Sequence, residues 1–274
     1  MSHTLFKGAR AMRRGRPGQD GTTDGETTAP VKALVAKDFV ILAALPISFA
    51  VAWTLPAPLF RGLARAFSPL AARAMATRNR PVIERMERLV GDRPLALSPA
   101  AVVQESIAGH AEEYLQVLRE YRPFGWRPIM YLEGRAHVDA ALERGYGAIL
   151  WMGYFSFAGL VAKKALHRDG IPVSHLSHPT HGFSRSRLGI RYINRIRGRI
   201  EERYLGDRVM LSLDGAAAAM RALHRRLRDN QVVSITVRER ALHPATTPFL
   251  DGTIRVATGA ADLAHATKAA LLPV

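Results

Sequence analysis

The chain has 274 residues, of which 48% are apolar, and it carries 39 basic and 23 acidic residues for a formal net charge of +16. It contains no cysteine, which excludes a disulfide scaffold, a thiolate metal site, an iron–sulfur cluster and a cysteine nucleophile. The positive charge favours an anionic partner, namely nucleic acid, anionic lipid or an acidic protein, and composition does not choose among these.

Residues 1–37 are rich in Gly, Thr and Arg and have little apolar periodicity. We interpret them as a mobile basic tail. Residues 38–80 differ sharply, because no charged residue occurs from Phe39 to Phe60. This stretch is long enough to cross a bilayer as a helix, but it is interrupted by three prolines: Pro46, Pro56 and Pro58.

Proline bends or ends a helix, so we expect a broken helix that lies in or dips into one leaflet. A single membrane span and a buried core helix are the alternatives. Arginines alternate with apolar residues from Arg61 to Arg80, which predicts an amphipathic helix at an interface or an ordinary surface helix. Residues 38–80 are therefore interpreted as a hydrophobic, membrane-associated segment.

Residues 81–274 show the pattern of an α/β domain. Ser98 followed by Pro99 predicts a helix start. The expected helices cover 100–121, 135–144, 157–168, 187–205, 214–228 and 259–269, and the expected strands cover 129–132, 147–152, 171–176, 209–213, 231–237 and 271–274. Alternating strands and helices predict a mostly parallel sheet flanked by helices.

The order and spacing of several segments resemble the bacterial lipid A biosynthesis acyltransferases, the lauroyl and myristoyl transferases within the lysophospholipid acyltransferase group. The resemblance runs from about Val31 to the C-terminus. It rests on Leu55-Pro56 and on residues 132–142, 145–150, 183–189, 248–252, 257–264 and 270–274. Relatives usually continue beyond the last strand, so we expect a truncated chain with an uncovered sheet edge.

This resemblance implies an α/β acyltransferase on the cytoplasmic face of the bacterial inner membrane. Such an enzyme moves a fatty acyl chain from acyl carrier protein, or acyl-CoA, to the hydroxyl of a lipid acceptor. It implies no cofactor and no metal. A nucleic-acid partner is not expected, since the long uncharged segment and the alternating strands do not resemble a small DNA-reading domain.

The family's signature is a His followed after four residues by Asp or Glu, at the junction between the first strand of the core and its helix. Tyr154 and Gly159 stand at these positions here. A tyrosine with a pKa near 10 is mostly in the wrong protonation state for a base at neutral pH. The chain is therefore an acyltransferase that uses another base, a catalytically silent homologue that binds lipid or a partner protein, or a divergent branch with different chemistry.

Candidate catalytic residues are Tyr154 itself and His178. The latter belongs to a cluster with His175 and His181 that follows the next strand, and a polar surface role is the alternative for all three. The spacing and the lack of nearby acidic ligands make a metal site the weaker interpretation. Ser156 is a candidate for substrate binding or for capping the following helix. Its flanking glycines are too distant for a hydrolase nucleophile elbow.

Arginines recur every four residues in the predicted helix 187–205, which places them on one slowly drifting stripe. The stripe consists of Arg187, Arg191, Arg195, Arg199 and Arg203. It would suit a phosphorylated lipid, a membrane or acidic acyl carrier protein, or else a solvated face paired with Glu201 and Glu202. We expect Arg187 and Arg191 to bind substrate. Arg238 and Arg240 follow another strand and are candidates for binding the acceptor phosphate, or for pairing with Glu239 or Asp251.

Overall fold

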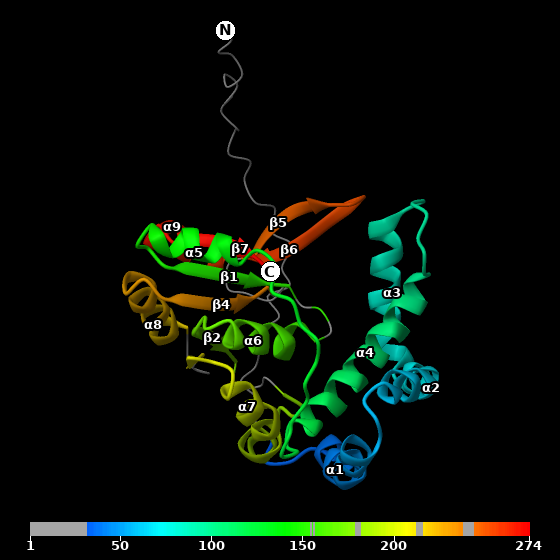
Figure 1. Ribbon diagram of the computed structural model, residues 1–274. Coiled ribbons are helices and arrows are strands. Elements are labelled where there is room, and N and C mark those ends of the chain that lie inside the picture. Colours follow the sequence, from blue (N-terminus) through cyan, green and yellow to red (C-terminus); the bar gives the residue numbers. More distant parts are fainter. Residues whose placement is uncertain (1–31, 154, 156, 179–181, 212–215, 238–243) are drawn as a thin grey trace. The chain divides into compact units, whose positions relative to one another are not determined.

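The computed structural model describes residues 32–153, 155, 157–178, 182–211, 216–237 and 244–274 (Figure 1). The helices are α1 (Ala36–Thr54), α2 (Leu59–Ala74), α3 (Ala76–Val90), α4 (Pro99–Arg119), α5 (Arg135–Glu143), α6 (Ala158–Arg168), the π-helical turn η1 (Gly189–Ile193), α7 (Asn194–Glu202), α8 (Ala217–Arg228) and α9 (Gly259–Thr267). The strands are β1 (Ala148–Met152), β2 (Val173–Ser177), β3 (Asp207–Met210), β4 (Val232–Thr236), β5 (Pro244–Phe249), β6 (Gly252–Ala257) and β7 (Ala270–Pro273).

Five strands form a wholly parallel sheet in the order β3-β2-β4-β1-β7. Strand β1 lies between β4 and β7, with Ile149 opposite Val233 on one side and Leu271 on the other. The predicted parallel sheet flanked by helices is thus confirmed. Because the side chains of a strand alternate between faces, the sheet has two apolar faces and needs a helical layer on each.

Two separate apolar cores fill these layers. On one face Leu150 and Val173 pack with Val138 of α5 and Leu166 of α6. On the other face Ile149 and Val233 pack with residues of α8 and α9, among them Leu223, Leu227 and Leu263. The three inner strands β1, β2 and β4 have near-continuous burial, as expected for a sheet covered on both sides.

The N-terminal helices gather around α4, which begins where Ser98 accepts a hydrogen bond from the amide of Ala101 (3.3 Å). This start confirms the capping prediction. Ala52 of α1 and Phe60 of α2 are fully buried against Leu115 and Leu118 of α4. Among the residues that the structure describes, α1 is the one helix long and apolar enough to cross a membrane.

The uncharged segment is broken, as expected, but Pro46 does not break it. Helix α1 runs through Pro46, which is exposed, and ends at Thr54. The break falls between Leu55 and Pro58, where two prolines stand close together. The predicted helix 61–80 is likewise two helices, because α2 ends and α3 begins at Met75.

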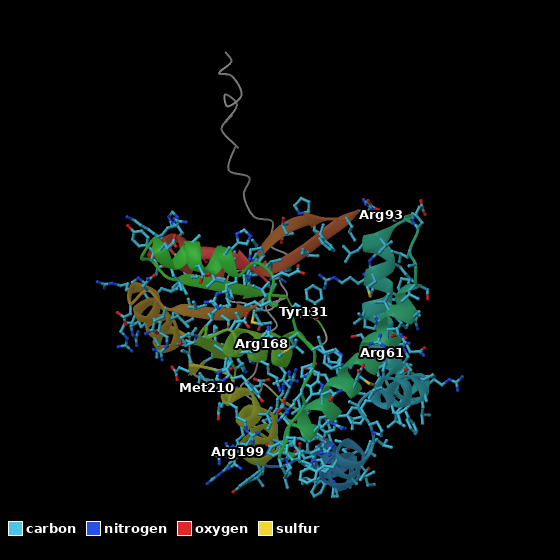
Figure 2. All side chains as sticks on the ribbon, in the orientation of Figure 1. Arg61, Arg93, Tyr131, Arg168, Arg199 and Met210 are labelled. Carbon is cyan, nitrogen blue, oxygen red and sulfur yellow. The ribbon has the colours of Figure 1, made fainter. Side chains whose placement is uncertain are left out.

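The chain from residue 129 to residue 132 forms no strand, so that prediction is wrong. Ile129 is 87% exposed and Tyr131 is 85% exposed (Figure 2). The apolar run satisfied the strand pattern, but Arg168 of α6 donates a hydrogen bond to the Met130 carbonyl (2.7 Å). The Arg168 side chain therefore binds the Met130 carbonyl oxygen, which in a sheet would accept a hydrogen bond from a neighbouring strand.

A two-stranded antiparallel hairpin, β5–β6, was not predicted. Its turn is fastened to the end of α3: the Asp251 amide donates to the Leu89 carbonyl (3.1 Å), and Arg93 pairs with the Asp251 carboxylate (2.6 Å). Arg93 lies beside the hairpin tip in Figure 2. This guanidinium holds the pKa of Asp251 below its usual value.

Candidate functional site

The carboxyl ends of the five parallel strands meet at one edge of the sheet, which is where open α/β sheets bind ligands. At this edge β1 ends beside Gly153, whose amide donates to the Val274 carbonyl at the end of β7 (2.7 Å). His178 lies half-buried one residue beyond β2. Strand β4 separates β1 from β2, so the ends of these two strands are about 10 Å apart at the usual strand spacing.

The predicted site residues Tyr154, Ser156, Arg238 and Arg240 lie outside the described residues, and so does His181. His175 is buried in β2, where its Nδ1 is 2.8 Å from the Ser234 hydroxyl of β4. This histidine therefore joins two neighbouring strands within the sheet. Of the histidine cluster, His178 alone among the described residues stands at the strand end.

A buried carboxylate from α4 reaches the junction between β1 and α6. Glu113 is 5% exposed, and its Oε2 accepts a hydrogen bond from the amide of Phe157, the residue that precedes α6 (3.4 Å). A Cβ atom built on Gly159 would lie 3.8 Å from Glu113 Oε1 and 3.1 Å from Arg197 Nη2. Glu113 thus places negative charge beside the N-terminus of α6, where the helix dipole favours it.

Glu113 belongs to a buried ionic cluster that joins four elements. Arg197 of α7 contacts Glu113 (2.7 Å) and Glu201 (2.7 Å). Glu201 is fully buried and also binds Lys163 of α6 (2.8 Å) and Arg208 of β3 (3.3 Å). Desolvation lowers the pKa of Lys163, and Arg208 and Arg197 lower it further against the opposing effect of Glu201. Buried charges tolerate the loss of a partner poorly, so the cluster fixes α6 relative to α4 and α7.

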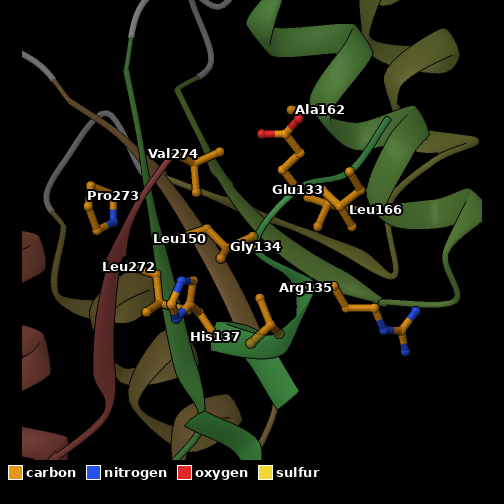
Figure 3. A pocket seen from close by; sticks show the side chains of 12 residues that line it. Glu133, Gly134, Arg135, His137, Leu150, Ala162, Leu166, Leu272, Pro273 and Val274 are labelled. Carbon is orange, nitrogen blue, oxygen red and sulfur yellow. The ribbon is translucent and has the colours of Figure 1, made fainter. Parts of the chain in front are cut away.

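An apolar cavity of about 480 Å³ lies between β1, β7, α5 and α6 (Figure 3). It is lined chiefly by Leu132, Val138, Leu150, Ala162, Leu166 and Leu272. Glu133, Arg135 and His137 contribute its polar groups, and Pro273 and Val274 close one side. Val274, which lines this cavity, accepts the hydrogen bond from the Gly153 amide, so one wall of the cavity is bonded to the end of β1.

A second cavity of about 690 Å³ separates α3 from β6 and begins at Val237, the residue after β4. Its apolar lining includes Met86, Leu89 and Ile254, and its charged lining consists of Arg85, Arg88 and Arg255. Both cavities thus combine apolar walls with charged groups, an arrangement that accommodates amphipathic molecules.

Arg187 and Arg191, predicted to bind substrate, are exposed and line neither of these two cavities. Within the described part of the chain, no three His, Asp or Glu side chains gather to hold a metal ion.

The fold and this edge define an α/β protein with a parallel sheet, an apolar helix that packs on α4, and two cavities that combine apolar walls with charged groups. The chain matches no protein-family model. It also matches no curated protein sequence.

Sequence reasoning missed Glu113 and the apolar cavity. Glu113 is 41 residues before Tyr154 in the sequence, and its position in a predicted helix gave no sign that it faces the β1–α6 junction. The cavity is built from four elements, so no local pattern reports it. The run 132–142 carries part of the resemblance, but its sequence does not show that it lies beside Leu272.

Proposed function

We propose that the protein is a membrane-peripheral acyltransferase that moves a fatty acyl chain from acyl carrier protein or acyl-CoA to the hydroxyl of a lipid. In this reaction the acceptor oxygen attacks the thioester carbonyl carbon, a C–O bond forms, the C–S bond breaks, and the acceptor proton passes through a base to the leaving thiolate. The proposed location is the cytoplasmic face of the bacterial inner membrane.

The observation that carries the proposal is the apolar cavity of about 480 Å³, one wall of which is Val274, the hydrogen-bond partner of Gly153. Burial of one methylene group is worth about 0.8 kcal/mol, so an apolar cavity of this kind favours a long hydrocarbon chain. Its polar groups are few, which suits a ligand whose reactive end is polar and whose remainder is a saturated chain.

Helix α1 supports the peripheral location. Its 19 residues would extend about 28 Å at 1.5 Å per residue. The residues before it pair with the α/β domain, where the Arg187 amide donates to the Lys32 carbonyl (3.0 Å). At its other end Arg119 of α4 binds the Leu55 carbonyl (2.6 Å). A helix held at both ends by one folded body lies along that body, and its exposed side then rests in a leaflet.

His178 is the proposed general base, because a neutral histidine accepts a proton near pH 7. Glu113 is the proposed orienting carboxylate of the β1–α6 junction: it occupies the neighbourhood of Gly159, the position at which the acyltransferases that this chain resembles carry an acidic residue. The arginines between α3 and β6, together with Arg238 and Arg240, are proposed to hold the acceptor headgroup.

The test is acyl transfer by the purified full chain from acyl carrier protein and acyl-CoA donors of graded length to a panel of lysolipids. Ala162→Leu narrows the cavity and is expected to lower turnover of the longest donors about tenfold relative to the shortest. Ala222→Leu, on α8 at the opposite face of the sheet, is the matched control and should leave that ratio unchanged. Absence of turnover with every donor would remove the acyltransferase proposal.

A catalytically silent lipid-binding homologue is the second candidate, favoured by Tyr154 and Gly159 at the two signature positions. It predicts saturable binding of the same donors or acceptors without transfer. His178→Ala separates the two candidates, since it should reduce turnover at least a hundredfold in the enzyme and leave lipid binding intact in both.

A further inference from the structure

The segment from Arg187 through η1 and α7 carries four exposed arginines: Arg187, Arg191, Arg195 and Arg199. Among the described residues, none of these four guanidinium groups forms an ion pair. Glu201 and Glu202, the partners considered from sequence, bind Arg208. We call these four arginines, with the exposed Leu188 and Tyr192 between them, the basic face.

Arg203 does not belong to the basic face, although its spacing places it on the same stripe. Its guanidinium donates to the Glu120 carbonyl (3.0 Å) and lies 5.7 Å from the centre of the Tyr121 ring. Arg191 lies 5.6 Å from the centre of the Tyr192 ring, but both side chains are exposed and belong to the basic face itself. Four of the five arginines of the predicted stripe therefore remain available to an outside partner.

Two contacts join the segment that carries the basic face to α1 or to the residues just before it. The amides of Arg187 and Leu188 donate to the carbonyls of Lys32 and Ala33, two residues that precede α1 (3.0 and 3.1 Å). Further along, Ile196 of α7 packs into the apolar cluster that contains Phe49 of α1. Figure 1 shows α1 and α7 at the same end of the Lys32–Val274 unit, and Figure 2 shows Arg199 projecting there.

The side of α1 that faces away from α4 is strongly apolar and uncovered. Its most exposed large side chains are Ile47 (69%), Val40 (68%) and Phe39 (60%). Basic groups bordering an exposed apolar helix form the amphipathic arrangement that binds anionic membrane surfaces, because the apolar side chains enter the acyl region while the cations meet the headgroups. An acidic protein would satisfy the arginines but would leave these apolar side chains in water.

We propose that the basic face binds the anionic headgroups of the same leaflet that receives the apolar side of α1. The partner is thus an anionic bilayer, recognised by charge and apolar burial together. This inference rests on the peripheral location within the proposed function, but it does not depend on acyl transfer.

The experiment measures co-flotation of the full chain with phosphatidylcholine vesicles prepared with and without phosphatidylglycerol. Each arginine near an anionic surface contributes about fivefold to partitioning. The variant Arg191→Gln/Arg195→Gln/Arg199→Gln should therefore bind anionic vesicles about a hundredfold more weakly and bind neutral vesicles as the wild type does. Added salt should weaken wild-type binding to the anionic vesicles.

The matched control is the variant Arg221→Gln/Arg225→Gln/Arg228→Gln, which removes the same amount of charge from exposed residues of α8. Helix α8 packs on the face of the sheet opposite to the face that α6 covers. Equal losses in the two triple variants would overturn the inference, because net charge alone would then explain the binding. Unchanged binding of the Arg191→Gln/Arg195→Gln/Arg199→Gln variant to anionic vesicles would overturn it as well. Failure of acyl transfer with vesicle binding intact would remove the proposed reaction and leave this inference standing.

Discussion

Two phenylalanines of α2, one buried and one exposed, allow the proposed membrane contact to be tested separately from the packing of the helix, because the same substitution can be made at each. Phe60 is fully buried in the cluster with Leu115 and Leu118, and the Arg119 guanidinium lies 5.4 Å from its ring centre. Phe67 is 62% exposed. Truncation of each to alanine should therefore affect different properties.

Phe60→Ala should lower the free energy of unfolding by about 3–5 kcal/mol, the range for a buried phenylalanine. Phe67→Ala should change it by less than about 0.5 kcal/mol. A phenylalanine buries about 200 Å², so 62% exposure leaves about 120 Å² for a bilayer, worth at most about 3 kcal/mol at about 25 cal/mol per Å². Phe67→Ala should then weaken vesicle partitioning between tenfold and a hundredfold.

Urea unfolding monitored by circular dichroism gives the stabilities, and vesicle flotation gives the partitioning. Unaltered stability in Phe60→Ala would show that α2 does not pack on α4 as described. Unaltered flotation of a folded Phe67→Ala would show that the exposed side of α2 does not enter a membrane.

Two further predictions concern stability. Burial raises the pKa of Asp38, but hydrogen bonds from the Ser184 and Ser186 side chains and the Val35 amide outweigh this effect and hold the pKa below the usual 3.8. Asp38→Asn should therefore lower the free energy of unfolding by about 1–3 kcal/mol at pH 7. In urea titrations this loss should shrink as the pH falls through the folded-state pKa of Asp38, and a loss independent of pH would contradict the assignment. Gly147→Ala should destabilise the folded protein clearly more than Gly145→Ala. Both glycines have positive φ (+71° and +78°), but a Cβ atom at 147 would meet the Gln231 carbonyl oxygen at 2.6 Å, whereas the space at 145 is open. Equal decreases in melting temperature would refute this steric argument.

The sequence located most elements of the sheet because their signals are local. The short apolar runs of β1 and β4 are bounded by glycine or polar residues, and Ser98 caps α4 without help from distant residues. The sequence predicted one continuous helix over 187–205, whereas the structure has the π-helical turn η1 followed by α7. The four-residue spacing of the arginines fits either arrangement, so it does not reveal the π-helical turn.

The hairpin β5–β6 and the false strand at 129–132 show where local patterns fail. The hairpin strand Pro244–Phe249 is almost entirely exposed and shows no alternation of buried and exposed residues, and its turn is bound by Arg93, 158 residues away from Asp251. The apolar run 129–132 has strand composition but meets no free strand edge. In both cases a contact distant in sequence decides the structure.

The sequence by itself determined the parallel sheet, the apolar N-terminal segment and the excess of arginine, since periodicity and composition act within a few residues. Only the tertiary structure decided which arginines remain exposed, that Glu113 reaches the β1–α6 junction, and that an apolar cavity lies between β1, β7, α5 and α6. These features depend on the packing of helices separated by tens of residues, and such packing has no local signature in the chain.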